Sequence, residues 1–471
     1  MRLLPCVVVH NCRIKDGDEF MTTVTGKLAE YLDKLQFEDL PEKVTAQTKY
    51  CLLDALGCGL GAVEHPDIKK MAEALLNYDN ASNSSVWGMN KKTSLGTAVF
   101  INSSMVHTFD FDDAHKMGKV HAGAVIIPVA LALAEIIPIT GKQLITAVVG
   151  AYEVMLRIAI GIGSSSHRLK GWHNTGTCGT FGAAAVAGKL LGLTPQQFIY
   201  AFGNAGTQSS GLWAFSADGS SSKKLHAGKA AQSGLTSALL AKKDFTGPSQ
   251  IIEAEDGGLF RAVSDEYNYE RVTKDLGSTF QITDVSYKPY PCCRTIHPSI
   301  DAALQVREQG LNPDDIEEIK VYTYKVAKVQ NDLPLPPQNG MIAQFNLPFI
   351  VAAALFEGPI GMQHFEERYY RDEKILALAE KVKVLLDEEI EKDYPAKWKC
   401  RMEVTAKDGR QYFGYTDAAK GDPMNPLSKE QHYAKFHNLL KNTRIDVPKL
   451  LKVVENLEEM ENVRELIQII I

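Results

Sequence analysis

The chain has 471 residues, more than one ordinary hydrophobic core accommodates, so two domains are expected. Its composition, 45% hydrophobic and 23% charged, is that of a soluble globular protein and excludes a low-complexity chain. The formal net charge of −6 argues against a nucleic-acid-binding protein, because binding to a phosphate backbone needs an excess of basic residues.

The eight cysteines show no regular spacing, and two of them, Cys292 and Cys293, are adjacent. No CxxC pair is present, so the sequence predicts neither a disulfide framework nor a structural zinc site. Reduced, buried thiols are typical of proteins in the cytoplasm, which is therefore the expected location.

The N-terminal apolar run at residues 3–9 does not have the pattern of a secretory signal. A proline interrupts it, and charged residues follow at once. We therefore interpret residues 1–20 as an appendage to a domain that begins near Met21.

Two later apolar runs, at residues 123–137 and 145–163, are predicted to be buried helices. The first is too short to cross a membrane, and the second carries Glu153 and Arg157. No membrane span is expected.

From residue 25 to about 243 the apolar residues recur with helical periodicity. Many of these segments are rich in Ala and Gly, and small residues allow helices to approach closely, so we expect a tightly packed helical core. After the first two helices, the predicted ones cover residues 66–78, 93–108, 123–137, 141–162, 177–192, 195–209 and 225–242.

The pattern changes after about residue 277. Residues 280–285 and 316–324 are predicted strands, and residues 399–405 and 411–415 form a predicted hairpin around Asp408 and Gly409. Predicted helices cover residues 296–309, 343–356 and 372–386, and the last ones cover 429–442 and 449–471.

The predicted fold is therefore mostly α, with a large all-helical domain and a smaller α+β lid domain. The helical domain takes residues 21–283 and 418–471, because the C-terminal helices are expected to pack back on it. The lid domain takes residues 284–417. No internal repeat is visible.

The densest polar cluster lies between two apolar helices, and it holds three carboxylates and three imidazoles within 15 residues. Burying so many polar groups is costly, so they should face water, one another or a ligand. Asp and His could hold iron or zinc, but the spacing fits no compact metal motif. For any single residue, a solvated loop is the simpler interpretation. The six are His107, Asp110, Asp112, Asp113, His115 and His121.

Three further segments could bind an anion. His173 precedes a small-residue helix, whose first N–H groups suit an anion, although a Gly-rich turn explains them too. Lys223 and Lys224 open another helix, where the dipole disfavours cations, so an anionic partner or plain solvation is indicated. Together with the carboxylates and imidazoles, these segments predict a pocket for a small polyanion. The third segment begins the second domain, where pockets are common, and offers Lys288, Arg294 and His297.

The chain resembles the MmgE/PrpD family. The similarity runs from about residue 25 through the C-terminal helices. It rests on DFDD at 110–113, GWHNTGTCGTFGAAAVAGKLLGL at 171–193, KKLHAGKAAQSG at 223–234, KPYPCCRTIH at 288–297 and AQFNLPFIVAAAL at 343–355.

This resemblance implies a helical domain built from both chain ends, a lid domain, a homodimer, and no metal or organic cofactor. It places Asp110, His121, His173, Lys223 and Lys288 at the family's active-site positions. We expect the two lysines to hold substrate carboxylates, and the two histidines to be general acid and base, because their unperturbed pKa lies near neutrality. Asp110 is expected to orient one imidazole.

The expected reaction is the dehydration of 2-methylcitrate or citrate. The family also includes iminodisuccinate epimerases and cis-aconitate decarboxylases, and all three reactions form or quench a carbanion-like centre beside a carboxylate. Ala114 and Phe349 stand where the decarboxylases would have a Thr and a Tyr, which weakens that alternative. A non-catalytic binder of organic acids is the alternative from another class.

Overall fold

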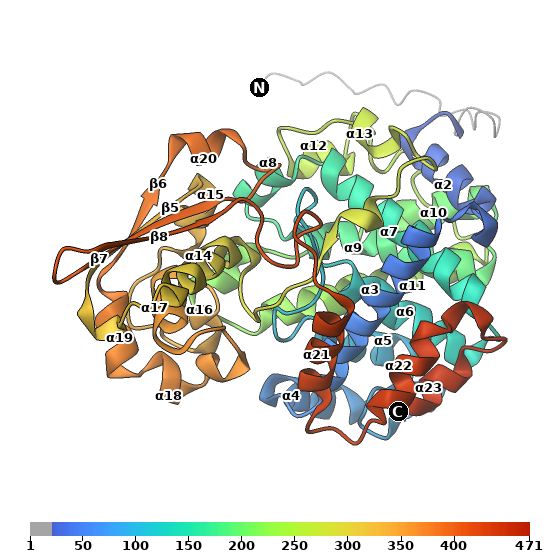
Figure 1. The fold of residues 1–471 in the computed structure, drawn as a ribbon. Coiled ribbons are helices and arrows are strands. Elements are labelled where there is room, and N and C mark those ends of the chain that lie inside the picture. Colours follow the sequence, from blue (N-terminus) through green and yellow to red (C-terminus); the bar gives the residue numbers. More distant parts are fainter. Residues whose placement is uncertain (1–20) are drawn as a thin grey trace, which may run out of the picture.

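The structure, a computed structural model, describes residues 21–471, so the predicted appendage at 1–20 lies outside the described residues (Figure 1). The fold is mostly helical with small sheets, which confirms the predicted fold class. Two hydrophobic clusters form the main cores: one is built by residues 28–287 and 436–470, and the other by residues 290–406. We call the first the helical body and the second, extended to residue 416, the α+β unit.

The helical body follows the predicted helices closely. Its helices are α2 (Val24–Lys34), α3 (Glu42–Gly61), α4 (Pro66–Leu76), α5 (Leu95–Val106), α6 (Gly123–Ile136), α7 (Gly141–Gly161), α8 (Ser164–Leu169), α9 (Asn174–Leu191), α10 (Pro195–Gly206), α11 (Ser222–Ala241), α12 (Leu259–Val263) and α13 (Glu270–Thr273). A small antiparallel hairpin, β1 (Ser84–Val86) with β2 (Lys91–Thr93), is its one departure from an all-helical pattern before α5.

Helices α9 and α11 pack against each other in the centre of the body. A Cβ atom on Gly234 of α11 would lie 2.3 Å from the carbonyl oxygen of Thr180 in α9, so only glycine allows this approach. The small residues of these helices therefore bring the start of α9 and the start of α11 together, and both starts carry predicted site residues.

The two long apolar runs are α6 and α7, and both are buried as predicted. Among the described residues, α7 alone is long and apolar enough to cross a membrane, but 94% of its apolar window is buried inside the protein. Such burial is typical of a core helix.

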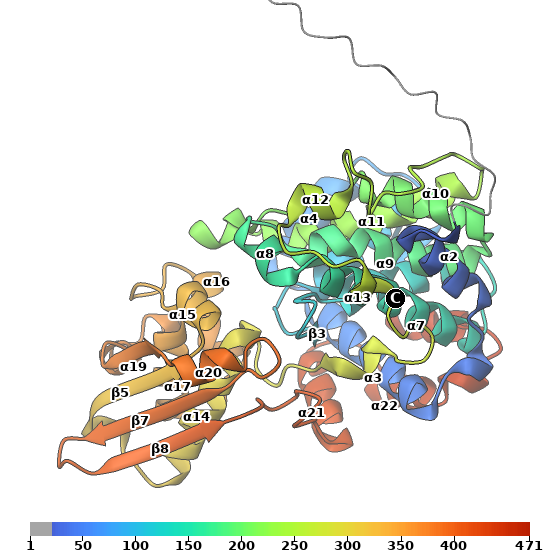
Figure 2. The same cartoon turned by 90° about the horizontal axis from the view of Figure 1, so that it is seen from above.

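The α+β unit contains a four-stranded sheet in the order β6-β5-β7-β8. Strand β5 (Ile316–Thr323) pairs in parallel with β6 (Val382–Leu386) and antiparallel with β7 (Cys400–Ala406), which forms a hairpin with β8 (Gln411–Thr416). Helices α14 (His297–Glu308) and α17 (Leu347–Glu357) cover one face (Figures 1 and 2). The shorter helices are α15 (Lys325–Asn331), α16 (Gly340–Ala343), α18 (Glu367–Tyr370), α19 (Glu373–Ala379) and α20 (Glu388–Lys392).

Two sequence predictions in this part of the chain are wrong. Residues 281–284 form a 3₁₀ turn, η3 (Gln281–Asp284), in which the Ile282 N–H donates to the Glu153 carboxylate. The strand is confined to β4 (Val285–Ser286), which pairs with β3 (Ala114–His115). The predicted helix 372–386 ends after α19, because the alternating VKVLL segment of β6 finds a free edge on β5.

The C-terminal helices return to the helical body. Helices α21 (Lys429–Leu440) and α22 (Val447–Glu455) pack on α3, and α23 (Arg464–Ile470) packs on α6. Figure 2 shows α21 beside the helical body, across from the sheet of the α+β unit. None of the six cysteines in the described part of the chain forms a disulfide, and all six are buried.

Candidate active site

A cavity at the junction of the helical body and the α+β unit gathers most of the predicted site residues. It holds about 830 Å³ of space, its opening to solvent included. Asp110, His121, His173 and Lys223 line it from the helical body, and Lys288 and Arg294 line it near the start of the α+β unit.

The lining of this cavity is strongly cationic. Its carboxylates are Asp110 and Asp422, whereas its lysines and arginines number six, an excess of four positive charges in a chain whose net charge is −6. Such an excess in a partly enclosed space favours a ligand with several negative charges. The six cations are Lys116, Lys119, Arg168, Lys223, Lys288 and Arg294.

Asp110 joins the two predicted substrate-binding lysines. Strand β3 (Ala114–His115) pairs with β4 (Val285–Ser286), and this pairing brings the loop that carries Asp110 next to Lys288. The ammonium groups of Lys288 and Lys223 donate to Asp110 Oδ1 at 2.9 and 2.5 Å, and Lys288 also donates to the Asp110 carbonyl at 2.7 Å.

The Asp110 backbone has a φ of 51°, which is unfavourable for a residue with a side chain. Burial raises the pKa of its carboxyl, but the charges of Lys223 and Lys288 more than offset this and hold the pKa well below its usual range. Asp110 is therefore ionised at neutral pH and fixes both lysines at the cavity wall.

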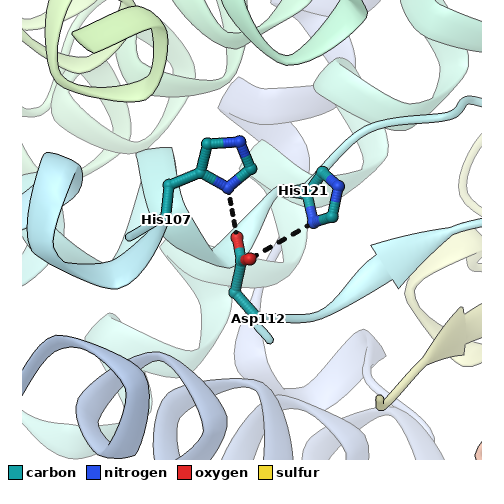
Figure 3. A group of neighbouring side chains, drawn as sticks. All are labelled: His107, Asp112 and His121. Atoms are coloured by element: carbon teal, nitrogen blue, oxygen red, sulfur yellow. Dashed lines mark hydrogen bonds and ion pairs between the residues drawn. The ribbon is translucent and has the colours of Figure 1, made fainter. Parts of the chain in front are cut away.

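Asp112 is the carboxylate that lies closest to the imidazoles (Figure 3), and the expected role of Asp110 in orienting one imidazole stays a prediction. Asp112 Oδ2 lies 2.9 Å from His107 Nδ1, and its Oδ1 lies 3.4 Å from His121 Nδ1, whereas Asp110 Oδ1 is 3.9 Å from His121 Nε2. Asp112 thus holds the Nδ1 sides of both rings and leaves His121 Nε2 toward Asp110. The sequence placed His107 and Asp112 in the polar cluster but gave them no role.

The same three residues could hold a metal ion, because one ligand atom from each lies within 4.8 Å of the others. The hydrogen bond between His107 Nδ1 and Asp112 already pairs two of these atoms without an ion. The expectation that the protein needs no metal stays a prediction.

His173 is the residue before α9, and its Nδ1 lies 3.0 Å from Nδ1 of His226 in α11. Burial, with the neighbouring charges of His107 and His226, lowers the pKa of His173 well below its usual range. The pKa of His226 is lowered to about 4, mainly by burial. His173 is therefore neutral at pH 7.

The remaining two predicted residues differ in their position. Arg294 lines the cavity, and its buried Nη1 has no hydrogen-bond partner among the described residues. His297 is fully buried beneath it, with Nε2 3.3 Å from the Cys292 carbonyl, and is not part of the cavity wall. The structure therefore does not support direct contact between His297 and a ligand.

Asp113, next to Asp112, should make stability depend on pH. Burial, aided by the charges of Asp54 and Asp112, raises its pKa to about 8. Between the usual value and pH 8 the folded state binds a proton that the unfolded state has lost, so unfolding becomes easier as pH rises. Asp113→Asn removes this carboxyl group and therefore its contribution to the loss of stability at higher pH.

We expect the free energy of unfolding of Asp113→Asn, relative to the unmodified protein, to rise by up to about 1.4 kcal/mol per pH unit between pH 6 and 8. Urea unfolding at four pH values measures it. Asp256→Asn, at an exposed carboxyl, is the control and should show a constant difference. A constant difference for Asp113→Asn as well would contradict the assignment.

Comparison with known proteins identifies the class to which this fold and cavity belong. The model of the MmgE/PrpD N-terminal domain matches residues 26–272, and that of the MmgE/PrpD C-terminal domain matches residues 290–459. The chain belongs to the MmgE/PrpD family.

Three relatives illustrate the activities known in this family. The chain is 28% identical over 460 residues to the cis-aconitate decarboxylase of Homo sapiens, covering 94% of this chain and 93% of that one. It is 27% identical over 475 residues to the cis-aconitate decarboxylase-like protein oryM of Aspergillus oryzae, covering 95% and 97%. It is 26% identical over 387 residues to the 2-methylcitrate dehydratase of Escherichia coli, covering 78% and 79%.

Proposed function

We propose that the protein is a lyase that dehydrates a small tricarboxylic acid of the 2-methylcitrate or citrate type, by proton transfer beside a carboxylate. The observation that carries this proposal is the cationic cavity, in which four uncompensated positive charges lie beside the imidazoles of His121 and His173. A binder of organic acids would need the cations alone. Dehydration also requires a general acid and a general base in the cavity.

In the proposed reaction, Lys288 and Lys223 bind the carboxylate next to the reacting carbon and stabilise the charge that develops there. Asp110 keeps both ammonium groups in place before the substrate binds. Burial lowers the Lys288 pKa, but Asp110 more than offsets this and raises it above its usual range, so this cation stays charged.

The two histidines then move the protons. His173, neutral at pH 7, removes the proton from the carbon beside the bound carboxylate. The C–O bond to the hydroxyl breaks as the C=C bond forms, and His121 protonates the departing hydroxyl from Nε2, which gives water. Asp112 lies on the Nδ1 side of the His121 ring, away from Nε2, and orients the ring.

Decarboxylation of cis-aconitate is the second candidate, because relatives with that name match over more of both chains than the dehydratase does. Two residues argue against decarboxylation. Ala114 lines the cavity without a hydroxyl, and Phe349 is fully buried in the core of the α+β unit. Neither can donate a hydrogen bond to a substrate carboxylate.

The test is to incubate the full chain with citrate, 2-methylcitrate, cis-aconitate and iminodisuccinate, and to follow each by ¹H NMR. We expect an alkene signal to replace one methylene signal of citrate, or the methine signal of 2-methylcitrate to disappear while its methyl doublet becomes a singlet. If cis-aconitate is the one compound converted and carbon dioxide is released, the protein is a decarboxylase and the dehydratase assignment is wrong. No conversion of any compound would contradict a lyase. The predicted homodimer and cytoplasmic location remain predictions.

A further inference from the structure

Three cations of the cavity form no ion pair within residues 21–471: Lys119, Arg168 and Arg294, of which the first two belong to the helical body. Lys119 belongs to the tight turn between His115 and Val120 and has a φ of 51°. Its ammonium group donates to Ser165 Oγ at 2.9 Å and lies 5.2 Å from the ring centre of Tyr394. Within residues 21–471 it forms no ion pair. A strained backbone that directs a cation into a cavity is typical of a functional position.

Arg168 in α8 is the second cation. Its guanidinium stacks on Trp213 at 3.8 Å from the ring centre, which fixes its plane. Its Nε is buried and finds no hydrogen-bond partner in the described part of the chain. A planar guanidinium held in this way is suited to bind a carboxylate through two parallel hydrogen bonds.

The charge of Arg168 acts on Lys119. Burial and then the charge of Arg168 lower the pKa of Lys119 to about 8, and burial lowers the pKa of Arg168 to about 10. Two neighbouring cations without a counter-ion are unfavourable, and an anion between them would relieve both effects. The buried hydroxyl of Tyr394, also without a partner among the described residues, adds a third free donor.

A cation at the protein surface is ordinarily solvated or paired with a nearby carboxylate, and Lys170 illustrates this arrangement. Lys170 lies just after α8, is partly exposed and pairs with Asp265 at 2.6 Å, outside the cavity. Lys119 and Arg168 differ, because both line the cavity and neither has an acidic partner within residues 21–471.

We infer that Lys119 and Arg168, with Tyr394, form a second carboxylate-binding subsite, separate from the one at Lys223, Asp110 and Lys288. This inference rests on the proposed function and defines its substrate class. The substrate carries one carboxylate beside the reacting carbon and another, distal, carboxylate at Lys119 and Arg168. The cavity therefore selects an acid with two or more carboxylates over a monocarboxylate of similar length.

The test is calorimetric binding of two unreactive acids, tricarballylate and butyrate, to the full chain; butyrate has no distal carboxylate. We expect the unmodified protein to bind tricarballylate at least tenfold more tightly than butyrate. The variant Lys119→Met/Arg168→Met should lose at least tenfold in affinity for tricarballylate and less than threefold for butyrate. Lys170→Met is the matched control, because it removes a cation just beyond the same helix end and should change neither affinity more than twofold.

Equal losses for both acids, or no loss for either, would overturn the subsite. Circular dichroism and thermal melting verify the fold of each variant. If the double variant does not fold, Arg168→Lys keeps the charge but not the two parallel hydrogen bonds. It should weaken tricarballylate binding about threefold to tenfold, and unchanged binding would overturn the inference.

Failure of the subsite and failure of the proposed reaction are distinguishable. If no compound is converted but tricarballylate selectivity depends on Lys119 and Arg168, the subsite stands and the lyase assignment falls. If a tricarboxylate is converted and the double variant keeps a normal KM for it, the lyase assignment stands and the subsite falls.

Discussion

The variant His121→Gln should turn over the true substrate about 100- to 10,000-fold more slowly than the unmodified protein, which is the usual effect of losing a general acid or base. Glutamine keeps the approximate size of the imidazole and its hydrogen-bonding capacity toward Asp112, but it cannot transfer a proton at neutral pH. Steady-state kinetics measures the effect. The loss should appear in kcat, while tricarballylate affinity should change less than threefold.

A chemical rescue separates this role from a structural one. In His121→Ala the ring leaves a space at the cavity wall, and added imidazole should restore part of the rate in proportion to its concentration. A His121→Gln variant with near-normal kcat, or a loss of rate explained entirely by weaker binding or unfolding, would contradict the assigned role.

The variant Arg157→Met should destabilise the fold by about 3–5 kcal/mol, the usual effect of removing one partner of a buried ion pair. Arg157 is fully buried, and it donates to Glu153 Oε2 at 2.9 Å and to the carbonyls of Lys274 and Thr279 at 2.6 and 2.8 Å. Its loss leaves these acceptors buried without a donor. The substitution also removes the hydrogen bonds that hold residues 274–279, which precede β4 and Lys288.

Guanidinium unfolding measures this change, and a double-mutant cycle assigns it. Burial raises the pKa of Glu153 to about 7 even with Arg157 beside it, so this carboxylate is costly to keep charged. Arg157→Met/Glu153→Gln should therefore recover part of the lost stability. A loss below 1 kcal/mol for Arg157→Met would show that water or a rearranged segment 274–279 replaces its contacts.

The helical body could be predicted from the sequence because its signals are local. The continuous apolar surface of α7 and the capping residue Thr140 mark that helix without reference to any neighbour. The two wrong predictions both depend on a partner distant in sequence. Residues 281–284 form a turn because the Ile282 N–H donates to the Glu153 carboxylate, and VKVLL becomes β6 because the edge of β5 is free.

The candidate site could be predicted in part. The sequence placed Asp110, His121, His173, Lys223 and Lys288 in one pocket, and all five line the same cavity. It could not say which carboxylate faces which imidazole, because the positive φ at Asp110 turns that side chain toward the lysines and leaves Asp112 to the rings.

Lys119 and Arg168 gave no signal in the sequence. A single basic residue in a turn or a short helix has the same local pattern whether it is solvated or lines a cavity. Only the position of Ser165, Trp213 and Tyr394 around these two cations reveals that they are enclosed.

The most direct test of proton transfer beside a carboxylate is deuterium incorporation. The full chain is incubated in heavy water with cis-aconitate or with 2-methyl-cis-aconitate, and the carbon-bound hydrogens are followed by NMR. Our account predicts that deuterium enters the carbon beside a carboxylate, in a hydrated product if the dehydration runs in reverse or in a decarboxylated product if carbon dioxide is released. Saturating binding of these acids with no deuterium in any recovered compound would contradict it and leave an organic-acid-binding protein.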